Sequence, residues 1–154
     1  MKLAQALLLR ADLQKKLASL GSRLTEVAKI QEGDSPAEDP ASLLAEAEQA
    51  VDKLEMLIYQ INKANLQSTL PDGRDITSLL AKRDMLLVRH RILTTTRDAA
   101  VAAPDRYSGR ELRWVPAVDV SVLQKQMDEI GRQIRELNGT IQEANWSIEV
   151  KVEI

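Results

Sequence analysis

The sequence has no cysteine, no phenylalanine and a single histidine. Without cysteine, the chain can form no disulfide and no thiolate metal site, and it has no thiol nucleophile. With one histidine, we recognise neither a Ser-His-Asp order nor the Glu-x-x-His pairs of carboxylate-bridged dimetal bundles. A glycine-rich phosphate loop is also missing. These absences predict a protein that is not an enzyme and that holds no metal or cofactor. One alternative stays open, a metal site made by several copies of His90 that the symmetry of an oligomer brings together.

Long apolar runs and a strong net charge are missing too. No stretch approaches the roughly 20 apolar residues that span a bilayer. Arg10 and Asp12 interrupt the short apolar run at the N-terminus before the core of a signal peptide is complete. A formal net charge of -2 gives no overall reason to expect nucleic acid as a partner. We therefore expect a cytoplasmic protein with no membrane partner.

The residues that are abundant are those of helical bundles. Leu, Ala, Gln, Glu, Lys and Arg dominate the composition. Apolar residues recur in alternating steps of three and four, the period of one helix face. With the turn residues between them, these repeats predict helices at about 3–31, 41–66, 76–102 and 120–146. We expect one all-α domain spanning 1–154, an elongated antiparallel four-helix bundle made of long helical hairpins.

The second and fourth expected helices each carry a regular apolar seam, which predicts the side that each helix buries. The seam of the second helix consists of Leu44, Ala47, Val51, Leu54, Ile58 and Ile61. The seam of the fourth helix is the most regular and consists of Leu123, Met127, Ile130, Ile134, Leu137, Ile141 and Ala144. Asn138-Gly139 falls inside the fourth helix, and the sequence leaves open whether the helix breaks there.

Two short segments, about 111–115 and 148–154, have the character of strands, and the second alternates apolar and charged residues. An unbroken fourth helix is about 40 Å long, which places its two ends too far apart for these segments to pair within one subunit. The terminal strand then pairs with another chain or stays unpaired. We therefore expect a small β element between subunits and a homo-oligomer, a dimer or a higher assembly of dimers, formed by antiparallel strand exchange.

The third helix carries three ionisable residues where a core would hold leucine. Arg83, His90 and Arg97 lie seven apart, on a line between two apolar rows. Unpaired charge in such a place costs several kcal/mol. Their candidate partners on the second helix are Glu48, Glu55, Asn62 and Asn65. This pattern predicts either an arginine–carboxylate network that fixes helix register or a polar cavity that binds a small anion.

The connection after the third helix is a second candidate site. Its candidate binding residues are Arg106, Tyr107, Arg110, Arg113 and Trp114. Guanidinium groups beside a stacking aromatic suit phosphate and single-stranded nucleic acid. In the alternative interpretation, Tyr107 and Trp114 pack over helix ends while the arginines bind helix C-terminal carbonyls or carboxylates at a subunit interface.

Several short motifs extend over nearly the whole chain. They are Gln31-Glu32-Gly33, Pro36 with Glu38-Asp39-Pro40, Ile61-Asn62 with Asn65, Ala81 with Arg83-Asp84, Arg106-Tyr107, Arg135-Glu136-Leu137, Ile141-Gln142 and Asn145-Trp146. Together they resemble the pattern of a small uncharacterised bacterial family, some of whose members carry the label septicolysin. The resemblance implies a helical-hairpin or bundle subunit that self-associates, and it supplies no catalytic residues. The label implies a cytolysin.

The sequence thus predicts an oligomeric structural or interaction protein whose partner is another copy of itself. A small-anion or nucleic-acid binding module, using the basic third helix and the connection 106–114, is the first alternative. The cytolysin that the label implies is the second. It is disfavoured, because the sequence shows no secretion signal, transmembrane hairpin or aromatic-rich membrane tip.

Overall fold

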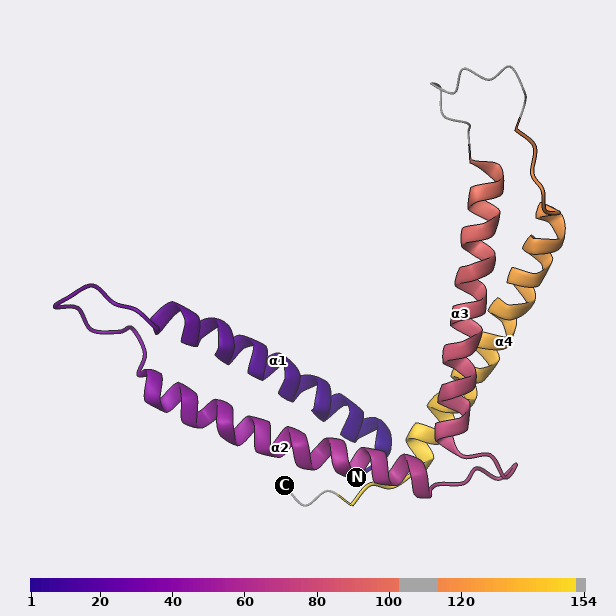
Figure 1. Cartoon of the computed structure of the whole chain (residues 1–154). Coiled ribbons are helices and arrows are strands. Elements are labelled where there is room, and N and C mark those ends of the chain that lie inside the picture. Colours follow the sequence, from indigo (N-terminus) through magenta and orange to yellow (C-terminus); the bar gives the residue numbers. More distant parts are fainter. Residues whose placement is uncertain (103–113, 152–154) are drawn as a thin grey trace. The chain divides into compact units, whose positions relative to one another are not determined.

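The computed structural model describes residues 1–102 and 114–151. Within these ranges the chain forms four helices, α1 (Leu3–Val27), α2 (Pro40–Gln67), α3 (Ile76–Val101) and α4 (Val120–Ser147), which Figure 1 shows in sequence order. The all-α fold and the four expected helices are therefore confirmed. None of these helices is long and apolar enough to cross a membrane.

Aspartate side chains set the starts of α2 and α4. Asp39 accepts hydrogen bonds from the backbone nitrogens of Ala41 (3.3 Å) and Ser42 (3.0 Å), and Pro40 occupies the first helical position. Asp119 does the same for the first turn of α4. These bonds satisfy backbone donors that have no partner inside the helix. The starts of α2 and α4 can therefore be predicted from the sequence.

The largest difference in helix length is at the end of α1, which ends at Val27 instead of near residue 31. Val27 is the last α1 residue of a buried cluster. Beyond it, the Asp34 nitrogen donates to the Gln31 carbonyl at 3.0 Å, and Gly33 adopts a φ of 95°. That conformation favours glycine. The chain thus turns towards α2 as soon as the core contacts of α1 end.

The described chain divides into two compact units. The first comprises Met1–Asp75 and Glu143–Ile154, and the second comprises Ile76–Gln142. α4 runs unbroken through Asn138-Gly139, so the possible break there does not occur. Because this one helix contributes residues to both units, the expectation of a single domain stays a prediction.

In the first unit, α1 and α2 are antiparallel. Near the start of α1, the buried residues Leu3, Ala6, Leu57, Ile61 and Val150 form one cluster. Near the other end of α1, Leu20 and Val27 pack with Leu43 from the start of α2. The beginning of each helix therefore meets the end of the other. Burying aliphatic side chains in this way stabilises the pair by about 1.5–3 kcal/mol for each fully buried residue.

The buried row of α2 differs from the seam that the sequence indicated. The structure buries Leu43, Ala50, Leu57 and Ile61. Leu44, Val51 and Ile58, which we name the outer row, are 52%, 50% and 37% exposed. Both rows are apolar and both repeat every seven residues, so hydrophobicity alone could not identify the row that faces α1. The expected seam was therefore wrong by one residue at these three positions.

The terminal segment was also assigned the wrong partner. Backbone hydrogen bonds of 2.8–2.9 Å join residues 148–150 to residues 1–3 of the same chain, around an antiparallel bridge between Lys2 and Glu149. The expectation that this segment pairs only with another chain is wrong for these residues. The length of α4 separates residues 148–150 from residues 111–115, but residues 1–3 of the same chain offer a partner at the near end of the helix.

The expected pairing of the other strand segment, 111–115, is not tested by the structure. Residues 111–113 and 152–154 lie outside the described residues, while Trp114 and Val115 are described and belong to no strand. Pairing of 111–115 with a second subunit therefore stays a prediction.

In the second unit, α3 and α4 are antiparallel neighbours. The Arg97 Nη1 near the end of α3 donates to the Gln124 Oε1 near the start of α4 at 3.1 Å. The expected seam of α4 is confirmed. Its buried members in this unit are Met127, Leu137 and Ile141.

Candidate functional site

The ionisable line of α3 is partly buried, as its position between apolar rows requires. The side chains of Arg83 and Arg97 are 31% and 29% exposed. His90 is also of intermediate burial. Each arginine therefore reaches water with part of its guanidinium group, while its aliphatic stem covers apolar surface.

Each arginine is neutralised by the next residue of its own helix. The Arg83 Nε and Nη2 donate to the Asp84 Oδ1 at 3.0 and 2.8 Å. The Arg97 Nε and Nη2 donate to the Asp98 Oδ1 at 2.9 and 2.6 Å. The signal in the sequence was the repeated Arg-Asp pair, which we overlooked because adjacent helix residues point in different directions. These contacts leave less charge for a bound anion to compensate.

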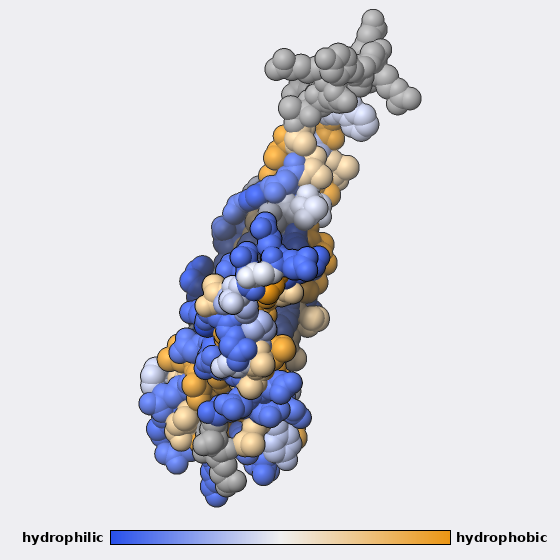
Figure 2. All heavy atoms as spheres, turned by 90° about the vertical axis from the view of Figure 1, so that its left-hand side faces the viewer, coloured by the Kyte–Doolittle hydropathy of each residue, from blue (hydrophilic) through white to orange (hydrophobic). Residues whose placement is uncertain are grey.

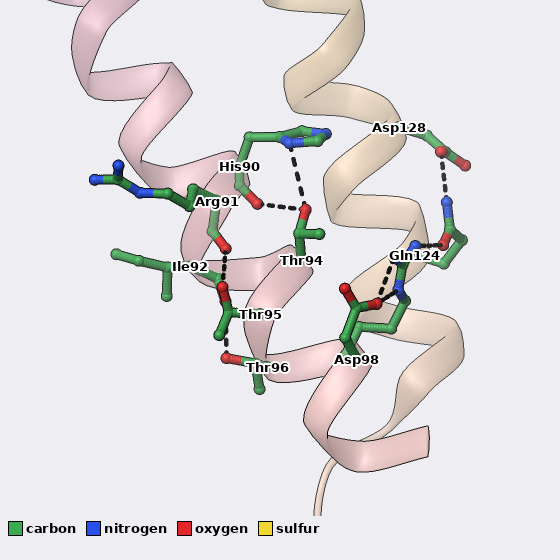
Figure 3. Close-up of polar contacts among 10 residues, drawn as sticks. His90, Arg91, Ile92, Thr94, Thr95, Thr96, Asp98, Gln124 and Asp128 are labelled. Atoms are coloured by element: carbon green, nitrogen blue, oxygen red, sulfur yellow. Dashed lines mark hydrogen bonds and ion pairs between the residues drawn. The ribbon is translucent and has the colours of Figure 1, made fainter. Parts of the chain in front are cut away.

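His90 makes its contacts within α3. Its Nδ1 lies 3.4 Å from the Thr94 hydroxyl oxygen, and that hydroxyl donates to the His90 carbonyl at 2.9 Å (Figure 3). In residues 1–102 and 114–151, no three His, Cys, Asp or Glu residues gather in a group that could hold a metal ion. Thr94 lies one turn after His90 on the same helix, so both of these polar contacts are local.

The expected partners of this line on α2 are mostly exposed and belong to the other compact unit. Glu48, Glu55 and Asn62 are exposed. Asn65 is of intermediate burial, and its buried Oδ1 has no hydrogen-bond partner among residues 1–102 and 114–151. All four belong to the first unit, whereas the α3 line belongs to the second. Because Asp84 and Asp98 already pair with the two arginines, a network with α2 is not needed to neutralise them.

The second candidate site falls largely outside the described residues. Arg106, Tyr107, Arg110 and Arg113 all lie in the undescribed range. Trp114 is described and is 69% exposed. The binding role of this connection stays a prediction.

A groove of about 360 Å³ lies between α3 and α4 in the second unit, and the sequence did not reveal it. Its lining residues are Arg89, Ile92, Leu93, Gln126, Glu129 and Ile130. Aliphatic side chains supply three of these six residues, and Arg89 supplies a positive charge. A sequence signal existed in Met85 and Ile92, which are apolar on the side of α3 away from its buried row. They are 56% and 59% exposed.

Glu129, the carboxylate that lines this groove, is paired within α4. The Arg132 Nη2 contacts the Glu129 Oε1 at 2.7 Å, and the Gln133 Nε2 donates to the same oxygen at 2.8 Å. The guanidinium of Arg132 and the amide of Gln133 hold the pKa of the Glu129 carboxyl below its ordinary value. Arg132 also contacts the Glu136 Oε1 at 2.6 Å, so it is shared between two carboxylates, and the positive charge in the lining of the groove comes from Arg89.

The outer row is a further exposed apolar feature, on α2. Glu48 and Glu55 follow Leu44 and Val51 by four residues each, so they lie on nearly the same side of the helix. The face drawn in Figure 2 likewise shows hydrophobic residues exposed among hydrophilic ones. The first unit thus carries an apolar row with acidic flanks, and the second carries an apolar groove with Arg89 in its lining.

Comparisons with known proteins agree with this fold. The chain has no match among curated proteins. Among solved structures it is similar to a functionally unknown conserved protein from Corynebacterium diphtheriae, with 33% sequence identity, a TM-score of 0.91, and coverage of 98% of this chain and 99% of that chain. The expected uncharacterised bacterial family is confirmed, while neither comparison bears on the septicolysin label. Residues 10–150 match a family of unknown function, and the chain therefore belongs to that family, DUF6847.

Proposed function

We propose that this protein is a self-associating structural or interaction module of the cytoplasm, acting by binding and not by catalysis. The observation that supports this proposal is the outer row of α2. Leu44, Val51 and Ile58 recur every seven residues with a third to a half of each side chain exposed. Single exposed apolar residues are ordinary in soluble proteins. A row at heptad spacing is the pattern through which helices associate.

The acidic flanks of the row support association further. Glu48 and Glu55 border it at the positions from which coiled-coil helices select their partners by charge. Such residues favour a partner surface that is apolar in its centre and basic at its edge. The expected occupant is a second copy of the chain, since α3 carries the exposed apolar residues Met85 and Ile92 alternating with the exposed cations Lys82 and Arg89.

Light scattering coupled to size-exclusion chromatography tests the proposal. A single chain has a mass of 17.2 kDa, and we expect a mass of two chains or more at micromolar to millimolar concentration. Val51→Lys should shift the mass to that of one chain, because it places a charge in the centre of the row. Gln49→Lys is the matched control, since Gln49 is exposed and lies on the opposite side of α2. A single-chain mass for the unchanged protein at every concentration contradicts the proposal.

A further inference from the structure

We propose that the outer row of one copy docks onto the exposed face of α3 and the α3–α4 groove of a second copy. This inference rests on the proposed self-association and names the two surfaces that meet. We call them the donor face and the acceptor face. The donor face consists of Glu48, Val51, Glu55 and Ile58 with the preceding Leu44. The acceptor face consists of Lys82, Met85, Arg89 and Ile92 with the groove beside them.

The two faces have the same spacing and opposite charge. On α2, acidic residues alternate with apolar ones at successive steps of three, four and three residues. On α3, basic residues alternate with apolar ones at the same steps. Each step of three or four residues stays on one side of a helix. Placed side by side and running in the same direction, the two helices therefore bring apolar residues together and oppose two carboxylates to two cations.

The four charges of these faces are available for a partner. In the part of the chain that the structure describes, the ion pairs involve neither Glu48 nor Glu55, and neither Lys82 nor Arg89. Other charged residues nearby are already paired, as for Lys16 with Glu46 at 2.7 Å. Complementary charges that are still free steer association and select the partner.

The groove gives the acceptor face a place for apolar side chains. Ile92, Leu93 and Ile130 line it, and Arg89 stands at its rim. A volume of about 360 Å³ is large enough to hold several water molecules. Aliphatic side chains of the outer row would displace this water from an apolar surface, which favours binding. The acidic residues beside the row would then lie close to Arg89.

A second copy fits these faces because each chain carries both. Two copies that each dock their donor face on the acceptor face of the other form a dimer with two equivalent contacts. This dimer is the assembly that we infer.

Charge reversal tests the pairing. Glu48→Lys with Glu55→Lys reverses the donor face, and Lys82→Glu with Arg89→Glu reverses the acceptor face. Each double variant alone should dimerise at least about tenfold more weakly, because like charges then oppose one another. An equimolar mixture of the two should recover the dimer, since both contacts of the mixed dimer are again complementary. Lys53→Glu and Arg91→Glu are matched controls, because both residues are exposed on other sides of the same helices and should leave the mass unchanged.

Cysteine pairs provide an independent readout, because the chain has no thiol of its own. Val51→Cys and Met85→Cys chains, mixed and oxidised, should form a disulfide-linked dimer of one chain of each kind. A native dimer whose affinity survives both charge reversals overturns this inference and leaves the proposed function standing. A single-chain mass for the native protein overturns both. A chain with both cysteines that links only within itself shows that the faces do not meet between copies, which also overturns the inference.

Discussion

Two leucines of α2 offer a direct measurement of which apolar row is buried. Leu57 is 0% exposed and belongs to the cluster with Leu3 and Ile61, whereas Leu44 is 52% exposed in the outer row. Changing each to alanine removes the same atoms from the same helix. Because the chemistry is matched, any difference between the two losses reports burial alone.

The structure predicts very different losses of unfolding free energy. Leu57→Ala removes a fully buried side chain and leaves a cavity, which costs about 3–5 kcal/mol. Leu44→Ala removes a side chain already half in water and leaves no enclosed cavity, so the loss is about 1 kcal/mol. With a urea dependence of about 2 kcal/mol/M, the unfolding midpoint should fall by about 1.5–2.5 M for the first change and by about 0.5 M for the second.

Urea unfolding followed by far-ultraviolet circular dichroism measures both midpoints. The comparison is made at a dilution where light scattering finds single chains, so that dissociation does not contribute. At higher concentration the effect of Leu44→Ala should grow, whereas that of Leu57→Ala should stay constant. Equal midpoints for the two variants at high dilution, or a larger loss at Leu44, would refute the assignment of the buried row.

Two further predictions concern acid stability and the C-terminal segment. Pairing with arginine lowers the pKa of the Glu38 and Glu129 carboxyls below the ordinary value of 4.5. Their contribution to the free energy of unfolding is therefore complete above pH 4.5 and is lost as the pH falls through the lower pKa values of the folded state. A thermal unfolding temperature that already falls between about pH 7 and pH 5 would contradict this. Val150→Asp should lower the unfolding free energy by about 3–5 kcal/mol, because it places an unpaired charge in the buried cluster. Lys151→Asp, at the exposed neighbouring position, should change the unfolding free energy little. Equal losses in urea unfolding would show that Val150 is not buried.

Helix positions were readable from the sequence because the signals are local. Asp39 and Asp119 cap the helices that follow them, and their effect depends on the next three residues alone. α4 has a single regular apolar row, so its buried side was also correct. α2 has two such rows, at Leu43 and at Leu44. The choice between them depends on the side chains that α1 presents, which no property of α2 by itself records.

The candidate sites depend on contacts that the sequence does not specify. The line through Arg83 and Arg97 was found by periodicity, but its neutralisation by adjacent aspartates requires the arginine side chains to fold back along their own helix. The groove at Ile92 and Ile130 exists only when two helices lie side by side. Its members are too far apart in sequence for spacing to connect them.

The pairing of residues 1–3 with 148–150 has a consequence for the order in which the chain folds during synthesis. Residues 76–142 are contiguous and emerge from the ribosome together, whereas the first unit needs segments from both ends. Closing so long a loop in a flexible chain costs about 4 kcal/mol of entropy, and folding of the intervening unit shortens that loop. Part of the cluster of α1 and α2 therefore stays exposed to water until Val150 has left the ribosome. A nascent chain halted before that point should expose apolar surface to chaperones, and emergence of Val150 should remove it.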